Sequence, residues 1–390
     1  MASASVIGVI TTPDNQHEGR RAYHALDAWR GLASLWVVLY HASLSLPVLL
    51  PARAGFVPGL WLQGGYLGVP LFFVISGYCI ANAAVSAARR EQGAKAFFLA
   101  RLRRIYPPYL AVLLLSVAVS LLSFLRILSA TAHNHPFDVL SQKPLFFLAA
   151  LTVTQVPLHQ ALVQAVFWTL NFEVAFYVVV GTLLLLPPEL RTARTLLNAL
   201  HVVTLSATAL LVFLPGPPWF PLNFWPQFGL GALTFDIVRH PRLRFPRVAL
   251  ALTGAGIAGF AMMHSYGNSF VFGAPPMRIG FLVSLGFALL LLVLYPLDKQ
   301  AECLPPVRLF AWLGGFSYSL YLVHPLAIGS VLYAARALNL PAQSPSLWLI
   351  GEAAVSLVCA WFFFLCCERP FLPVRKPKNS MPQAGLAAKN

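Results

Sequence analysis

The sequence is poor in charged residues, and most of those it has are of one sign. Only 10% of its 390 residues are Asp, Glu, Lys or Arg, whereas soluble domains carry about a quarter. There are 27 basic residues against 12 acidic ones, which gives a formal net charge of +15. So little charge excludes an ordinary water-soluble domain. The cations are dispersed among the ends of apolar segments, a pattern that does not favour nucleic acid as a partner.

Cysteine is also scarce, and no internal repeat is present. The five cysteines show neither the close spacing of a metal site nor the pairing pattern of an extracellular disulfide framework: Cys79, Cys303, Cys359, Cys366 and Cys367. The sequence therefore predicts no metal site. The absence of a repeat argues against the two-fold internal symmetry that many transporters carry.

Long apolar runs make up most of the chain, which is 58% hydrophobic. Runs of about 20 residues cover the ~30 Å hydrocarbon core of a bilayer at ~1.5 Å per residue. We expect ten such spans, at 28–50, 66–88, 106–128, 167–187, 195–215, 222–238, 246–265, 277–297, 309–335 and 346–367. The stretch 144–157 is too short to cross, so we interpret it as a re-entrant or interfacial helix. The fold class is thus an all-α polytopic integral membrane protein.

The distribution of Lys and Arg sets the expected orientation, because these residues concentrate in cytoplasmic loops. With ten spans and the N-terminus inside, the inside segments hold 21 of the 27 cations and the outside segments hold four. This arrangement predicts a multi-pass membrane protein with both termini cytoplasmic. The expected divisions are an N-terminal tail at 1–27, a transmembrane domain at 28–373 and a disordered tail at 374–390.

Two polar residues of the first span lie on one helix face. Arg30 and His41 are eleven residues apart, which brings them within roughly 20° of the same face and about 16 Å apart along the axis. Asp27 falls close to that face. A charged group inside a bilayer needs a partner or a purpose. We expect His41 to be neutral near mid-span and able to accept a proton, as a general base must. The alternative is a buried histidine that a neighbouring backbone or hydroxyl group satisfies.

Three further polar elements stand out. Arg101 and Arg104 are spaced to face one way on a helix and to hold a diphosphate, although a lipid-contacting cationic cluster explains them equally well. Glu173 lies about one and a half turns inside its span, where it would pair or exchange a proton. His324 lies at the depth of His41, so the two imidazoles could share a polar cavity. The alternative is that His324 caps a carbonyl freed by the kink at Pro325. Other polar residues are weaker candidates: Ser76, an ordinary packing residue in lipid, and Asp236 and Glu352, which lie close enough to helix ends to be hydrated or paired.

Taken together, six segments resemble the acyltransferase-3 family of membrane-bound O-acyltransferases in order and in position. They are Arg30-Gly-Leu-Ala with His41, Phe72-Phe-Val-Ile-Ser-Gly-Tyr78, Arg101-Leu-Arg-Arg104-Ile-Tyr106-Pro107, Trp168-Thr-Leu-Asn-Phe-Glu173, Tyr318-Ser-Leu-Tyr-Leu-Val-His324-Pro325 and Glu368-Arg-Pro370. The resemblance covers residues 23 to about 373. It implies transfer of an acyl group, usually acetyl, from cytoplasmic acetyl-CoA or another short acyl-CoA to a hydroxyl of a carbohydrate, glycolipid or glycoside.

Site roles follow from the same resemblance. It implies His41 as the essential histidine with Glu173, His324 and Arg30 as further catalytic residues, and Arg101, Arg104, Arg30 and Tyr106 as the coenzyme A contacts. From the residues alone, two other functions stay open. One is a proton-coupled transporter or flippase of a glycoside or lipid-linked sugar, in which the buried His and Glu relay protons. The other is a non-catalytic scaffold.

Overall fold

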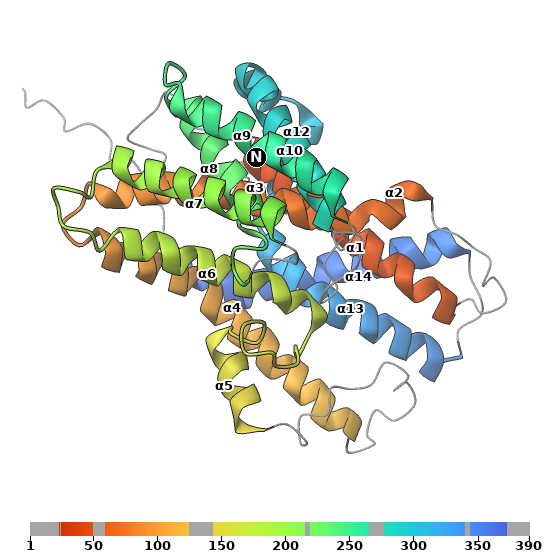
Figure 1. Cartoon of the computed structure of the whole chain (residues 1–390). Helices are drawn as coiled ribbons and strands as arrows, with labels where there is room; N and C mark the ends of the chain where they lie inside the picture. Colours follow the sequence, from red (N-terminus) through yellow and green to blue (C-terminus); the bar gives the residue numbers. More distant parts are fainter. Residues whose placement is uncertain are drawn as a thin grey trace, which may run out of the picture.

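The computed structural model describes residues 23, 25–49, 59–124, 143–214, 219–264, 277–339 and 344–372. Within these ranges the regular elements are helices, most of them long and packed side by side (Figure 1). The predicted tails at 1–27 and 374–390 lie almost wholly outside the described residues. The α-helices are α1 (Leu26–Leu49), α2 (Leu60–Gln63), α3 (Gly68–Ala88), α4 (Gly93–Phe124), α5 (Pro144–Thr152), α6 (Trp168–Leu183), α7 (Ala193–Phe213), α8 (Trp225–Arg239), α9 (Phe245–Met263), α10 (Met277–Leu294), α11 (Asp298–Ala301), α12 (Pro305–Gly314), α13 (Ser317–Ala337) and α14 (Pro345–Phe363).

The helices support the polytopic membrane fold that the apolar runs predict. Eight stretches of the described chain are long and apolar enough to cross a bilayer: Trp61–Ala88, Gly93–Leu121, Ala165–Leu183, Ala193–Phe213, Phe245–Met263, Met277–Ala301, Ser317–Ala337 and Pro345–Phe371. The other two predicted spans correspond to α1, which carries Asp27, Arg30 and His41, and to α8, which has 15 residues. The count of ten spans therefore remains a prediction.

The stretch 144–157 forms the short helix α5, which lies at the edge of the bundle beside α4 (Figure 1). Nine residues extend about 13 Å, too little to cross a bilayer. The hydroxyl of Tyr109 on α4 donates to the carbonyl of Ala150, 2.7 Å away, and fastens α5 to the bundle. This length agrees with a re-entrant or interfacial helix.

Glycines let two pairs of helices approach closely. A Cβ atom on Gly77 of α3 would lie 1.9 Å from the carbonyl oxygen of Phe228 on α8, and one on Gly231 of α8 would lie 1.9 Å from that of Val74 on α3. The crossing therefore requires glycine on both helices, as small residues do at membrane helix interfaces. Gly314 of α12 meets α1 in the same way, 1.8 Å from the carbonyl oxygen of Asp27.

Two helix boundaries differ from the prediction. The expected span at 309–335 is two helices, because α12 ends at Gly314 and α13 begins at Ser317. The break falls where Gly314 and Gly315 let the chain turn against the start of α1. The helix of the expected span at 106–128 begins earlier than predicted, because α4 begins at Gly93 and continues through Pro107 and Pro108, so Arg101 and Arg104 lie on it.

Candidate active site

A cavity of about 90 Å³ lies among α1, α3, α4, α6 and α13. Its polar lining combines two cations, one carboxylate and several hydroxyl groups: Arg30, Ser76, Arg104, Thr169, Glu173, Ser317, Tyr318 and Tyr321. Apolar side chains complete it, among them Phe72, Phe73 and Leu170. The volume is well below the roughly 300–1,000 Å³ of pockets that enclose a drug-sized ligand. The cavity can therefore enclose only one end of a larger molecule.

Glu173 lies in this cavity and is held by two hydroxyl groups. Ser76 on α3 donates to Oε1 of Glu173 at 3.0 Å, and Tyr177, one turn further along α6, donates to the same oxygen. Two donors on one oxygen fix the orientation of the carboxylate and leave Oε2 to face a ligand. Ser76 is thus a partner of Glu173, a role that its sequence context, without a neighbouring base, did not indicate.

Arg30 enters the cavity from α1 with part of its charge already paired. Its Nη1 lies 2.6 Å from Oδ1 of Asp27, and its Nη2 donates to the sulfur of Cys79 at 3.1 Å. The Asp27 pair confirms the expectation that these residues share a helix face. Because a guanidinium has five N–H donors, the remaining ones can bind an anionic ligand.

The two arginines of α4 have separate surroundings. Arg104 lines the cavity, whereas Arg101 does not. The guanidinium of Arg101 lies between the rings of Phe97 and Tyr177, 5.5 and 5.6 Å from their centroids, and its Nε has no hydrogen-bond partner among the described residues. Tyr106 is half-buried, packs on Tyr109 and does not line the cavity. Of the expected coenzyme A contacts, the cavity therefore contains Arg30 and Arg104.

His41 and His324 contact each other. Nε2 of His324 lies 3.4 Å from Nδ1 of His41, and the ring centroids are 4.9 Å apart. Nδ1 of His41 lies 2.9 Å from the carbonyl oxygen of Val37, and Nδ1 of His324 lies 3.0 Å from that of Leu320. A carbonyl oxygen only accepts, so each Nδ1 carries a hydrogen and each Nε2 has a lone pair. Nε2 of His41 is then a base with no hydrogen-bond donor among the described residues.

The imidazole pair lies beside the cavity, not in its lining. Tyr321 lines the cavity, and its ring centroid is 6.0 Å from that of His324, three residues further along α13. The hydroxyl of Tyr321 is held by Thr169 Oγ1 at 2.7 Å and the carbonyl of Val166 at 2.5 Å. His324 is fully buried, while His41 is partly exposed. Tyr321 therefore connects the charged cavity with the histidines. The sequence feature that could have indicated this role is the position of Tyr321 three residues before His324, on the same helix face.

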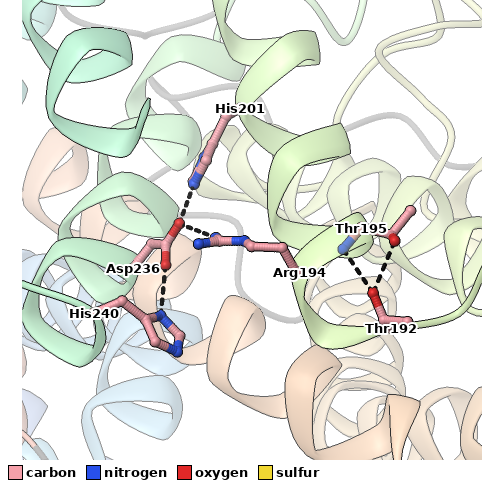
Figure 2. Close-up of polar contacts among 6 residues, drawn as sticks. All are labelled: Thr192, Arg194, Thr195, His201, Asp236 and His240. Atoms are coloured by element: carbon pink, nitrogen blue, oxygen red, sulfur yellow. Dashed lines mark hydrogen bonds and ion pairs between the residues drawn. The ribbon is translucent and has the colours of Figure 1, made fainter. Parts of the chain in front are cut away.

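A second polar cluster lies outside this site, where Figure 2 shows three side chains converging on Asp236. His201 and His240 each lie 2.8 Å from one of its carboxylate oxygens, and Arg194 contacts it as well. Asp236 is fully buried, and its partners come from α7 and from the end of α8. The cluster fastens these two helices together. Of the two alternatives expected for Asp236, hydrated or paired, the structure has the paired one.

Comparison with known proteins follows this geometry. Residues 23–365 match the acyltransferase domain family Acyl_transf_3. The chain belongs to this family. The match covers every helix of the cavity and both histidines of this acyltransferase. Within the described residues, no group of three or more His, Cys, Asp or Glu side chains is arranged to hold a metal ion.

Several bacterial proteins are similar over most of this acyltransferase. It is 29% identical over 332 residues to the exopolysaccharide production protein ExoZ of Rhizobium meliloti (strain 1021), which covers 83% of this chain and 94% of ExoZ. It is 23% identical over 377 residues to the peptidoglycan O-acetyltransferase OatA of Listeria monocytogenes, covering 90% of this chain and 56% of OatA. It is 24% identical to the O-acetyltransferase OatA of Staphylococcus aureus (strain NCTC 8325 / PS 47), covering 77% of this chain and 49% of OatA. No solved structure matches the chain.

Proposed function

We propose that this acyltransferase moves an acetyl or other short acyl group from acyl-CoA to a hydroxyl group of a carbohydrate-type acceptor, within a bacterial inner membrane. The observation that carries the proposal is the connection of a cationic cavity to a neutral histidine pair through Tyr321. The names of the relatives, which include an exopolysaccharide production protein and peptidoglycan O-acetyltransferase, support a polysaccharide, glycolipid or glycoside as the acceptor.

The cavity supports an anionic donor. Arg30 and Arg104 place two guanidinium groups around it, and Glu173 supplies one carboxylate. Guanidinium groups bind phosphate through paired N–H donors, and few other features of a membrane interior would attract an anion. Because the cavity encloses only part of a large ligand, the diphosphate of coenzyme A would lie at Arg30 and Arg104, the rest of the nucleotide would lie outside the cavity, and the pantetheine arm would extend past Tyr321. Arg101, stacked between two rings, would position the wall of this passage.

His41 supplies the chemistry in this proposal. Its Nε2 lone pair takes the proton of the acceptor hydroxyl as the oxygen attacks the thioester carbonyl, or it accepts the acyl group first and passes it on. The carbonyl of Val37 accepts from Nδ1–H of His41 at 2.9 Å, with Nε2 of His324 as a second acceptor at 3.4 Å, and together they hold the ring in the tautomer that leaves Nε2 basic. Glu173, with Oε1 held by two hydroxyls, would orient substrate from the cavity side. The buried setting keeps water from the thioester.

A proton-coupled transporter or flippase remains the rival function. It would use the same histidines and Glu173 as a proton relay and would move a glycoside without forming a covalent bond. Membership of an acyltransferase family favours the enzyme. A transporter would need no acyl donor, so a measurement of acyl transfer to the acceptor distinguishes the two functions.

The test measures acetyl transfer from radiolabelled acetyl-CoA in membranes of expressing cells, with mass spectrometry of the envelope glycans and secreted glycosides. His41→Asn should abolish the incorporation of label and leave the amount of inserted protein unchanged. His159→Asn is the matched control, because His159 is exposed and its positive φ of 51° suits asparagine. Parent activity in His41→Asn would refute the role of His41. The absence of label in the parent protein would refute acetyl-CoA as the donor.

A further inference from the structure

α14 carries a buried polar stripe that the proposed reaction has not used. Trp348, Glu352 and Ser356 are four residues apart, so they lie on one face of the helix. Glu352 and Ser356 are fully buried and Trp348 is 9% exposed. No described residue forms a hydrogen bond with Nε1 of Trp348 or with Oγ of Ser356. Buried polar groups without a protein partner are rare, and they mark places where water or a ligand group binds.

The contacts of Ser45 assign a hydrogen to Glu352. Oγ of Ser45 lies 2.7 Å from the carbonyl oxygen of Ala42 and 2.7 Å from both carboxyl oxygens of Glu352. A serine hydroxyl has one hydrogen to donate, and these are three acceptors. The contacts are satisfied when Glu352 is a neutral carboxylic acid that donates to Ser45, while Ser45 donates to Ala42. An ionised carboxylate there would be buried without a cation, which is costly inside a membrane.

The packing places this stripe behind the histidines. α1 and α14 are antiparallel, because Ser45 contacts Glu352 and Leu46 clusters with Trp348, whereas Val38 clusters with Ala360 and Phe364 nearer the other end. His41 lies one turn before Ser45 on α1, and Ser356 lies one turn after Glu352 on α14. Because the two helices are antiparallel, His41 is therefore level with Ser356. On α13, Val331 clusters with Trp348, so His324 is also close to the level of Ser356. Ser356 thus lies at the depth of the imidazole pair, one turn from Glu352.

We propose that Glu352 is the proton donor to the leaving group, acting through Ser356, and that it forms an acid–base pair with His41. This inference rests on the proposed function. His41 Nε2 takes the acceptor's hydroxyl proton, the new C–O bond forms and the C–S bond breaks. The thiolate takes the hydroxyl hydrogen of Ser356. The carboxyl hydrogen of Glu352, which is donated to Ser45 at rest, then turns toward Ser356, one turn along the same face of α14, and replaces it. The imidazolium then returns its extra proton to the carboxylate by the same path, so the products are an ester and a thiol with no net proton change.

The physical reason for such a donor is the low polarity of the site. A thiolate released among apolar helices is a buried charge, and protonating it removes the cost of that charge. Two titratable groups whose surroundings leave one as a base and the other as an acid are the usual arrangement for paired acid–base chemistry. Ser45 contacts Glu352, Trp348 lies one turn away on the same face of α14, and no ion pair joins Glu352 to a cation among the described residues.

Infrared spectroscopy of the purified protein in lipid tests the protonation state without any assay of activity. The parent should show the carbonyl band of a protonated carboxylic acid near neutral pH. Glu352→Gln should lose this band, whereas Glu302→Gln, at an exposed carboxyl, should keep it. A band that is unchanged in Glu352→Gln would overturn the assignment.

Kinetics test the role. Glu352→Gln and Ser356→Ala should each lower kcat at least tenfold and leave the KM values for donor and acceptor within about twofold, and Glu352→Asp should restore part of kcat. Parent kcat in both Glu352→Gln and Ser356→Ala would overturn the proposal, and so would equal losses in Glu352→Asp and Glu352→Gln. If Glu352→Gln does not fold, Ser356→Ala decides, because it removes only a hydroxyl. Failure of the proposed function is distinct, since it would appear as parent activity in His41→Asn.

Discussion

Replacing Arg104 by glutamine tests whether the cavity binds the phosphates or another anionic part of the donor. Arg104 lines the cavity with Arg30, whereas its neighbour Arg103 is exposed. A hydrogen bond to a charged group contributes about 1.5–3 kcal/mol, and about 1.4 kcal/mol corresponds to a factor of ten in affinity. Arg104→Gln should therefore raise the KM for acetyl-CoA by about 10- to 150-fold and change the KM for the acceptor little.

Arg103→Gln is the matched control on the same turn of α4. An exposed charge contributes up to about 1 kcal/mol, so its loss should raise the KM for acetyl-CoA by less than about fivefold. The assay varies acetyl-CoA at fixed membrane concentration and repeats the series at high salt, which should diminish only the Arg103 effect. A thermal unfolding measurement accompanies it, to show that both variants are folded. Equal KM changes in the two variants would refute the cavity as the donor site and leave both arginines as topology determinants.

Two predictions concern the scaffold. Gly77→Ala places a Cβ atom 1.9 Å from the carbonyl oxygen of Phe228, so it should lower the melting temperature and the yield of the purified protein. Gly259→Ala is the control, because a Cβ atom there has no atom within 4 Å, and it should leave both unchanged. Equal melting temperatures in the two variants would contradict the close crossing of α3 and α8. Asp236→Asn leaves Arg194 and two histidines without their anion and should destabilise the fold by about 3–5 kcal/mol. Its melting temperature should fall while the KM for acetyl-CoA in the remaining folded protein is unchanged, and a raised KM would instead connect this cluster with the donor.

The sequence was sufficient for what depends on one helix at a time. Apolar runs located the membrane helices, and helical periodicity placed Asp27 beside Arg30, where the structure has an ion pair of 2.6 Å. Equal depth in the bilayer suggested a polar site containing His41 and His324, and the structure brings their rings together. These relations follow from the rise and the turn of a helix, which are the same in any packing.

What depends on how helices pack could not be predicted. Arg101 and Arg104 are three residues apart, which leaves them about 60° apart around α4, and the packing of α6 puts Arg101 against Tyr177 and leaves Arg104 in the cavity. Glu352 was expected close enough to a helix end to be hydrated or paired, and it is fully buried against Ser45 of α1. Serine is an ordinary packing residue in membrane helices, so nothing in the sequence marked Ser45 or Ser356.

The distance between the cationic cavity and the base limits which donors the proposed reaction can use. Arg30 and His41 lie on one uninterrupted helix, so eleven residues fix their separation along the axis at about 16 Å. A donor that stays bound at Arg30 and Arg104 while its carbonyl reaches Nε2 of His41 must be extended by a similar length and must pass Tyr321. A compact donor such as an acyl phosphate carries its charge next to its carbonyl and cannot occupy both places at once. An acyl thioester on a long, uncharged arm can, and for this reason the geometry favours acyl-CoA.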